Sequence, residues 1–538
     1  MTYEDYLKKT GEYGEVTDIK LPLVTVVGIP TCSLSEIVYF QSGIVGQVFA
    51  IHRSHIEIIL FNKKSPAMAE RVVRTGEKLS VPVGIELLGH SINPIGENLL
   101  GGASIKTKTY RPLDGPLPGI TARASIKKPL HTGVTLVDML LPLGKGQKQL
   151  IIGDRKTGKT SLLLTMLKAQ VLDGAVVIYT GIGKKQSDIK HILSYLEKEN
   201  IAHKTVLVAS TSSDSPGMIY LTPFTAMSIA EGFRDLGMDV VVVFDDLSTH
   251  AKFYREMSLI GKRFPGRESY PGDIFFTHSR LLERAGNFKI EKGEVSITAL
   301  PVVETIESDL TSYIATNIMS MTDGHIFFDQ GTFAKGRRPA INVPLSVTRV
   351  GRQAQSPLKR DINQKLTAFI SLFEQMENLS HFGAELSGKV QNTLKTGEKL
   401  NVLFNQGKHT IIPEGVQLVV FALIWGNMIE DIDATVLEEK ITKLSDPKAV
   451  ALIKDITSGV NLDELLLKAN QKKPELEQFL GVFKTVVTET VTTTPAPPTE
   501  PGSPDDKNKP TQTTQTTEFS QTDSVLFVPI EDKKTRDM

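Results

Sequence analysis

The chain has 538 residues, of which 40% are hydrophobic and 23% are charged, which is ordinary for a soluble protein of several domains. Basic and acidic residues number 61 each, so no net charge draws the chain to nucleic acid or to an anionic membrane. Cys32 is the only cysteine, which excludes intramolecular disulfides and cysteine-based zinc sites and favours a cytoplasmic location. The longest apolar run, Val416 to Trp425, is too short to cross a bilayer, so we expect no direct membrane insertion.

The first two regions of the chain are rich in strand-like segments. A polar N-terminal segment, 1–18, precedes region 19–89, where β-branched and aromatic runs such as Leu23 to Gly28 and Val45 to Ala50 alternate with turn residues. This spacing is typical of a small β-barrel. In region 90–357, apolar runs such as Leu150 to Ile152 and Val240 to Phe244 alternate with helix-like segments. That pattern predicts a mostly parallel α/β sheet.

The C-terminal part of the chain changes character twice. Region 358–487 has helical periodicity and few β-rich stretches, which predicts a helical bundle. Region 488–538 is rich in Thr, Pro, Ser and Gln, so we expect a disordered tail. Within it, Ser524 to Ile530 is a short apolar segment, which fits either a docking motif for a partner or a chance apolar cluster in a free tail.

A P-loop pattern follows the strand-like run that ends at Ile152. The pattern G-x-x-x-x-G-K-[ST] is matched by Gly153-Asp154-Arg155-Lys156-Thr157-Gly158-Lys159-Thr160, and helix-like sequence follows. In such a loop, backbone N–H groups surround the phosphates, the lysine neutralises the terminal phosphate oxygens, and the hydroxyl binds Mg²⁺. We therefore predict that the chain binds ATP or ADP with Mg²⁺, with Lys159 on the phosphates and Thr160 on the metal.

A second carboxylate for the metal is expected at the end of the run Val240 to Phe244, where Asp245 and Asp246 follow. Asp245 would reach the Mg²⁺ ion through water. The pair could instead cap the next helix. The two roles are compatible.

Several longer segments resemble the α subunit of F1-type ATP synthases. They are Gly153 to Thr160, Asp245-Asp-Leu-Ser248, Arg263 to Asp273, His278 to Arg284, Ser296 to Thr305 and Pro339 to Val343. The resemblance runs from about Val45 to Leu400 and continues more weakly to about Val487. It implies a multidomain fold with a β-barrel, a central RecA-like P-loop domain and a C-terminal helical domain. It also implies an alternating hexamer with β-type catalytic subunits around a γ-type central shaft.

Two residues match α-type positions at the interface with the neighbouring catalytic chain. Arg349, in Leu345-Ser-Val-Thr-Arg-Val-Gly351, matches the arginine that enters the neighbour's catalytic site. Such an arginine finger stabilises the charge that develops during phosphoryl transfer, an effect worth ~10³ to 10⁵ in rate where it is known. The alternative for Arg349 is a structural ion pair. Ser320 matches a second α residue at that interface.

The resemblance places the catalytic glutamate of β-type chains at Lys184, in Gly181 to Ser187. A protonated lysine has no acceptor for the proton of an attacking water, so we expect the chain to bind nucleotide without hydrolysing it. α-type chains have Gln at this position, so Lys184 departs from them too. It would either hold the γ-phosphate or be a solvated surface lysine.

The adenine pocket is implied by resemblance to include Arg155, Arg338, Pro339, Gln406 and Lys408. The family segment has glutamine at both of the last two positions, whereas this chain has Lys408. An ammonium group donates hydrogen bonds and accepts none, so an acceptor for the adenine amino group is lost. Selectivity for the base is therefore in question.

The two ends of the chain depart from ordinary α subunits, since little sequence precedes the barrel-like region and a tail of about fifty residues follows the helical one. The resemblance implies an energy-coupling, proton-linked rotary complex at the cytoplasmic face of a membrane. The altered ends suggest a second reading, an α-like subunit of a specialised ATP-driven motor such as those of some wall-less bacteria, whose ring is not coupled to proton transport. A purely structural scaffold subunit is a third reading. Homohexameric RNA translocases and secretion ATPases are disfavoured by the neutral charge and by Lys184.

Overall fold

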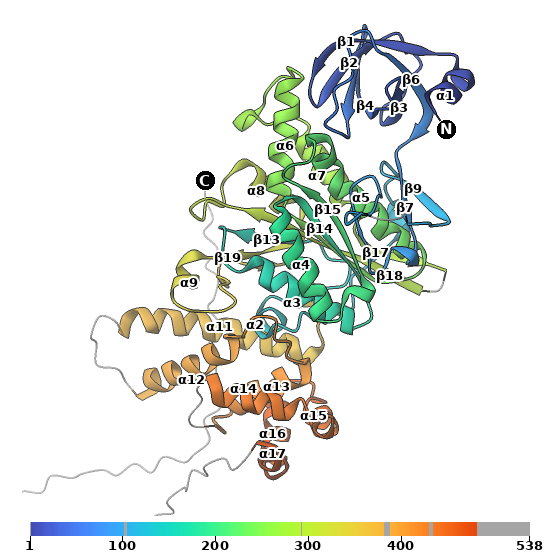
Figure 1. Cartoon of the computed structure of the whole chain (residues 1–538). Helices are drawn as coiled ribbons and strands as arrows, with labels where there is room; N and C mark the ends of the chain where they lie inside the picture. Colours follow the sequence, from blue (N-terminus) through green and yellow to red (C-terminus); the bar gives the residue numbers. More distant parts are fainter. Residues whose placement is uncertain (1, 102–104, 292, 381–387, 430–433, 481–538) are drawn as a thin grey trace, which may run out of the picture. The chain divides into compact units, whose positions relative to one another are not determined.

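The computed structural model describes residues 2–101, 105–291, 293–380, 388–429 and 434–480 (Figure 1). The expected disordered tail and its segment Ser524 to Ile530 lie outside these residues. Among the helices that are described, none combines the length and the apolar character that a bilayer crossing requires.

Six strands close into an N-terminal barrel in the order β1-β2-β5-β4-β3-β6. Alternate side chains point inward and form a core of aliphatic residues around Phe40, as the period of two in the sequence predicts. The first strand begins at Tyr13, before the expected start of the barrel region at residue 19. The sequence did not reveal this earlier start because the outward side chains of the strand are mostly polar and mask the alternation. The bounds of these elements are α1 (Tyr3–Thr10), β1 (Tyr13–Lys20), β2 (Leu23–Val27), β3 (Glu36–Phe40), β4 (Val45–Ile51), β5 (Ile56–Leu60) and β6 (Arg71–Lys78).

A ten-stranded sheet forms the centre of the next region, and its main path runs β20-β19-β13-β18-β16-β14-β15-β8. Along this path the strands from β19 to β8 are parallel to one another and β20 is antiparallel. Off the path, β17 pairs antiparallel with β18 and with β10. The parallel sheet that the alternating sequence predicts is therefore confirmed. Its strands are β8 (Ser91–Ile92), β10 (Arg123–Ala124), β13 (Gln149–Gly153), β14 (Val176–Lys184), β15 (Thr205–Thr211), β16 (Val240–Asp245), β17 (Gly286–Ile290), β18 (Gly293–Glu304), β19 (Gly324–Phe328) and β20 (Val347–Thr348).

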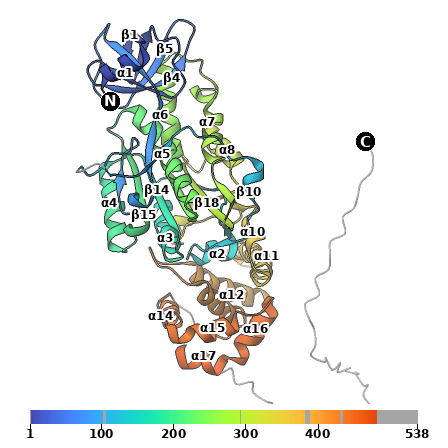
Figure 2. The same cartoon turned by 90° about the vertical axis from the view of Figure 1, so that its right-hand side faces the viewer.

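Helices cover both faces of this sheet (Figures 1 and 2). Side chains of one parity, such as Ile151 and Val243, pack with α2, α3 and α4, while those of the other parity, such as Ile152 and Val242, pack with α5 to α8. The strands are thus buried on both sides, which explains their continuous apolar runs. The helices are α2 (Thr135–Leu140), α3 (Lys159–Leu172), α4 (Gln186–Lys198), α5 (Pro216–Asp235), α6 (Leu247–Ile260), α7 (Ile274–Leu282), α8 (Tyr313–Met321), α9 (Gln330–Ala334) and α10 (Gly351–Ala354).

Short two-stranded sheets complete the central region, with β7 (Ser80–Val83) paired to β9 (Thr109–Pro112) and β11 (Pro129–Leu130) paired to β12 (Leu143–Gly144).

The chain after α10 is helical, as predicted. Its core is continuous with the core on the α3 face of the central sheet. The helices are α11 (Pro357–Ser380), α12 (Gly388–Phe404), α13 (Glu414–Trp425), α14 (Ala434–Leu444), α15 (Val450–Ile456), α16 (Leu462–Gln471) and α17 (Lys473–Leu480).

Candidate nucleotide-binding site

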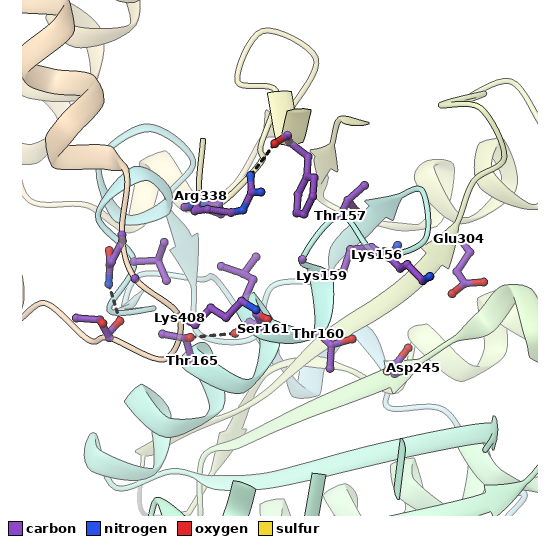
Figure 3. A pocket seen from close by; sticks show the side chains of 18 of the residues that line it. Lys156, Thr157, Lys159, Thr160, Ser161, Thr165, Asp245, Glu304, Arg338 and Lys408 are labelled. Atoms are coloured by element: carbon purple, nitrogen blue, oxygen red, sulfur yellow. Dashed lines mark hydrogen bonds between the residues drawn. The ribbon is translucent and has the colours of Figure 1, made fainter. Parts of the chain in front are cut away.

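A cavity of about 420 Å³ lies beside the N-terminus of α3, and its volume is within the range of small-molecule sites. Most of the residues predicted from the P-loop, together with Asp245, line it. In Figure 3, Lys156, Lys159, Thr160, Asp245 and Glu304 gather toward one end, and Arg338 and Lys408 lie toward the other. The cavity therefore has two ends, one at the P-loop and one at Arg338 and Lys408, which we call the base end because the resemblance implies the base there.

The P-loop connects β13 to α3, and its first glycine has a geometric reason to be glycine. Gly153 has φ +151°, and a Cβ at this position would lie 2.4 Å from the carbonyl oxygen of Phe328. Gly158, with φ +101°, is the N-cap of α3, so the loop delivers the chain to the positive end of a helix dipole. The strand–loop–helix context that the motif requires is present.

Lys159 is buried, and its Nζ donates to the carbonyl oxygens of Gly153 and Asp154 at 2.7 and 2.6 Å. Burial lowers the pKa of Lys159, and the nearby carboxylates of Glu304 and Asp245 oppose that shift. The ammonium group is thus held on the loop's own carbonyl oxygens beside the cavity. Thr160 is exposed and also lines the cavity.

The second and third residues of the P-loop do not line the cavity. The carboxylate of Asp154 accepts hydrogen bonds from the Thr305 hydroxyl at 2.6 Å and from the Ser308 backbone. Arg155 is exposed, and its Nε donates to Glu304 at 2.7 Å. Arg155 therefore lies away from the base end, where the resemblance had implied it.

Asp245 and Asp246, at the end of β16, have different partners. Asp246 is the N-cap of α6, and its Oδ1 accepts from the Thr249 backbone N–H at 2.6 Å. The helix-capping role considered for the pair thus falls on Asp246. Asp245 lines the cavity, with one carboxylate oxygen accepting from the Tyr179 hydroxyl and the other from Lys184 Nζ at 2.7 Å.

Lys184 is not a solvated surface lysine. Its side chain is 18% exposed, and its Nζ lies 2.7 Å from Asp245 Oδ1 and 3.3 Å from Asp246 Oδ2. Burial by itself lowers the pKa of Lys184, but the charges of the two aspartates outweigh burial and raise that pKa above its ordinary value. The group is a charged ammonium in the cavity wall.

The base end of the cavity is formed by α9 and by the connection between α12 and α13. The guanidinium carbon of Arg338 lies 3.5 Å from the ring centroid of Phe333 and Pro339 lies beside it in the wall. The amide of Gln406 is fully engaged within the protein, since its Oε1 accepts from the Thr135 N–H and its Nε2 donates to the carbonyl oxygens of Gly133 and Thr410. Lys408 is exposed and lines the cavity, so its ammonium is the freer polar group at this end.

Comparison with known proteins agrees with this geometry. Residues 133–348 match the ATP synthase alpha/beta family, nucleotide-binding domain, and residues 355–473 match the ATP synthase alpha/beta chain, C terminal domain. An ATP synthase subunit alpha from Neorickettsia sennetsu is 40% identical over 433 residues, which is 79% of this chain and 85% of the relative. The chain belongs to the ATP synthase alpha/beta family.

Relatives of the same description occur in other organisms. The ATP synthase subunit alpha of Acholeplasma laidlawii is 37% identical over 84% of this chain and 88% of its own length. That of Clostridium acetobutylicum is 36% identical over 81% of this chain and 86% of its own length. Within the ATP synthase alpha/beta family, the chain is thus similar to alpha subunits over most of its length, and the resemblance found in the motifs is confirmed.

The two predicted interface residues lie outside the cavity. Arg349 follows the edge strand β20 and is exposed. Its side chain forms no hydrogen bond or ion pair with any residue that the structure describes. Within that part of the chain, the alternative role of Arg349 in a structural ion pair therefore has no partner residue. Ser320, on α8, is exposed, and its hydroxyl donates to the Asn317 carbonyl oxygen at 2.6 Å.

The ATP synthase alpha/beta family implies a Mg²⁺ ion, but only one of the two predicted metal-binding residues fits that role in this chain. The Thr160 hydroxyl lies in the cavity and fits a metal ligand. Asp245, expected to reach the ion through water, does not fit as it stands, because its charge is already paired with the Lys184 ammonium at 2.7 Å, which would repel a second cation beside it. We therefore assign no metal-dependent step to this chain.

Several residues of the cavity wall were not predicted as site residues, and Glu304 and Phe333 are the two with the most evident contacts. Glu304 ends β18, which is parallel to β13 and places Glu304 opposite Gly153, so it belongs to the carboxyl edge where parallel sheets bind ligands. A carboxylate at the end of an apolar run was the available signal. Phe333 gave no such signal, because its role depends on the close approach of Arg338.

Proposed function

We propose that this chain is a regulatory, nucleotide-binding subunit of a rotary ATP synthase or ATPase ring. It binds ATP or ADP in its own cavity without hydrolysing it, and it supplies Arg349 to the catalytic site of an adjacent β-type subunit. The observation that supports binding without hydrolysis is Lys184, whose ammonium is paired with aspartates at the position where β-type chains have a glutamate. An ammonium that donates to two carboxylates cannot accept a proton from water.

The exposed position of Arg349 supports its role as an arginine finger in the neighbouring subunit. A buried or paired guanidinium would have to break its contacts before entering a neighbour, whereas Arg349 has no side-chain partner in the described part of the chain. The five donors of a guanidinium suit the oxygens of a transferring phosphoryl group. Ser320, also exposed, would lie at the same interface.

The test is the steady-state ATPase rate of the ring assembled from this chain and its β- and γ-type partners. We expect Arg349→Ala to lower kcat at least a hundredfold while the ring still assembles, because transition-state stabilisation is removed. Arg352→Ala is the matched control, since Arg352 is also exposed and follows three residues later on α10. An unchanged kcat in Arg349→Ala would reject the arginine finger and leave a scaffold role.

We further propose that the ring works at the cytoplasmic face of a membrane through its partners and not through this chain. The relatives' description as ATP synthase subunits supports a proton-linked rotor as the first expectation. Purification of the assembly from native cells with and without detergent, followed by mass spectrometry, tests this. Recovery of β- and γ-type chains with membrane proton-channel subunits supports it, and recovery of the same chains with unrelated membrane or cytoskeletal proteins replaces it with a specialised motor.

A further inference from the structure

Among the cationic side chains of the cavity wall, Lys184 lies at the end of β14 beside the end of β16 and is paired with the two aspartates. The two strands are parallel, and Gly181 is paired with Asp245. The register of β14 against β15 shifts between Gly181 and Lys184, so the last residues of β14 leave the regular strand path next to the aspartates. The lysine side chain lines the cavity together with Thr160 and Asp245.

The two aspartates need a cation whether or not a ligand is bound. The side chains of Asp245 and Asp246 are 7% and 3% exposed, and two adjacent buried carboxylates repel each other and lack solvation. Burial and Asp245 raise the pKa of Asp246, and the positive charge of Lys184 opposes them. In the chain as it stands, Lys184 supplies the positive charge that a metal ion would otherwise supply.

The ammonium group of Lys184 also has enough N–H donors to connect the aspartates to a phosphate. A lysine has three N–H donors, and two of them are directed at Asp245 and Asp246. The third is left for an oxygen of a terminal phosphate in the same cavity. A divalent ion placed against Asp245 would face this ammonium at short range and would have to displace it, which is unfavourable because like charges repel.

We propose that Lys184 replaces Mg²⁺ as the bridge between Asp245 and the terminal phosphate, so that this site binds its nucleotide with little dependence on divalent metal. The inference rests on the proposed function, since it concerns the same nucleotide site. It adds to that function that the nucleotide occupancy of this subunit would not change with the concentration of free Mg²⁺, whereas the occupancy of a metal-dependent site would.

The experiment is isothermal titration calorimetry of the purified full-length chain with ATP, once in excess Mg²⁺ and once in EDTA. We expect the two Kd values of the unmodified chain to agree within about threefold. For Lys184→Gln we expect the Kd in EDTA to exceed the Kd in Mg²⁺ by at least tenfold, because the amide leaves the aspartates without a cation. Lys185→Gln, a change at the exposed neighbouring lysine, should behave like the unmodified chain.

The outcomes separate the two proposals. If ATP binds in neither condition, the nucleotide-binding function itself fails. If the unmodified chain binds ATP in Mg²⁺ and loses at least tenfold in EDTA, the function stands and Lys184 does not replace the metal. Should Lys184→Gln fail to fold, Lys184→Arg keeps the charge, and its Kd values must also agree within about threefold in the two conditions; a metal-dependent Kd in that variant overturns the proposal.

Discussion

Arg284 and Glu231 form a two-pronged ion pair in the interior of the central region. Arg284 Nε and Nη2 donate to the two carboxylate oxygens of Glu231 at 3.0 and 2.7 Å, and the side chains are 3% and 1% exposed. Arg284 also donates to the Leu113 carbonyl oxygen and to the Ser228 hydroxyl. One guanidinium thus joins α5, the end of α7 and the chain before the P-loop strand.

We expect Arg284→Met to lower the free energy of unfolding by about 2 to 3 kcal/mol. This is less than the loss of about 3 to 5 kcal/mol for a buried charge with no partner left, because Arg111 Nε, 2.9 Å from Glu231, still compensates the carboxylate. Urea unfolding followed by circular dichroism measures this. Arg280→Met is the control, since Arg280 pairs with Asp114 at a side-chain exposure of 38% and such exposed pairs contribute up to about 1 kcal/mol. Equal losses in the two variants would mean that burial of the Arg284 pair has no special effect.

Base selectivity is expected to depend on Lys408. Its ammonium can donate to the O6 carbonyl oxygen of guanine but cannot accept from the amino group of adenine, and the amide of Gln406 is already engaged. The unmodified chain should bind ATP and GTP within about threefold of each other. Lys408→Gln restores an acceptor, and one hydrogen bond of about 1.4 kcal/mol corresponds to a tenfold preference for ATP.

Competition titrations with the two nucleotides measure that ratio. Lys448→Gln, which changes an exposed lysine outside the cavity, should leave it unchanged. A strong preference for ATP already present in the unmodified chain would show that Lys408 does not set the selectivity.

Gly153→Ala tests the close approach of the P-loop to β19. Because the added Cβ would meet the Phe328 carbonyl oxygen at 2.4 Å and φ is +151°, backbone strain of about 1 to 3 kcal/mol and displacement of the loop are expected. ATP binding should fall by at least tenfold, and the thermal unfolding midpoint should drop. Gly272→Ala, at a glycine with open space around the position of a Cβ, serves as the comparison. Retention of full ATP affinity in Gly153→Ala would contradict the geometric argument.

Acid should weaken the contact of α13 with the central region. Glu414 has its pKa lowered from 4.5 to about 2. Burial alone would raise this pKa, but the His131 imidazole and the Lys359 ammonium, each 2.9 Å from the Glu414 carboxylate, outweigh burial. Because the folded pKa is depressed, the unfolded chain binds more protons in this range, and the stabilisation is present above about pH 4.5 and is lost as the pH falls toward 2.

We expect the urea midpoint to fall between pH 5 and pH 3, with a contribution from Glu414 on the order of 2 kcal/mol after allowance for its partial exposure. Glu414→Gln should flatten this dependence, and Glu256→Gln, at an exposed position on α6, should not. Identical pH slopes for the unmodified chain and Glu414→Gln would refute the assignment.

The sequence predicted the layers of the fold well because their signals are local. Alternation marked β4, the run of valines marked β16, and the P-loop pattern placed the N-terminus of α3. The site was predicted less completely, because its remaining features depend on contacts between distant segments. Lys184 looked equally suited to phosphate or to solvent until β14 and β16 were placed side by side, and Gln406 looked like a base-binding amide until its partners near Gly133 were known.

The roles of the two adjacent aspartates show the same limit. The sequence predicts that Asp245 reaches the metal ion through water, and it allows helix capping by either aspartate of the pair. The hydrogen-bond partners decide, because Asp246 lies just beyond the end of β16, where its carboxylate reaches the Thr249 backbone N–H as well as Lys184. Only the folded chain assigns Asp246 to the Thr249 N–H and Asp245 to the cavity.

The hydrogen bonds of Gln406 have a consequence for how this protein would respond to its ligand. The connection between α12 and α13 supplies Gly407, Lys408 and Thr410 to the cavity wall, while Gln406 fastens that connection to Gly133 and Thr135. An occupant of the cavity would therefore touch both the P-loop and this connection, which lie far apart in the sequence. Amide hydrogen exchange across 405–412 should slow when the cavity fills. This connection is one route by which nucleotide occupancy would affect the helices that follow it, beside the core that they share with α3.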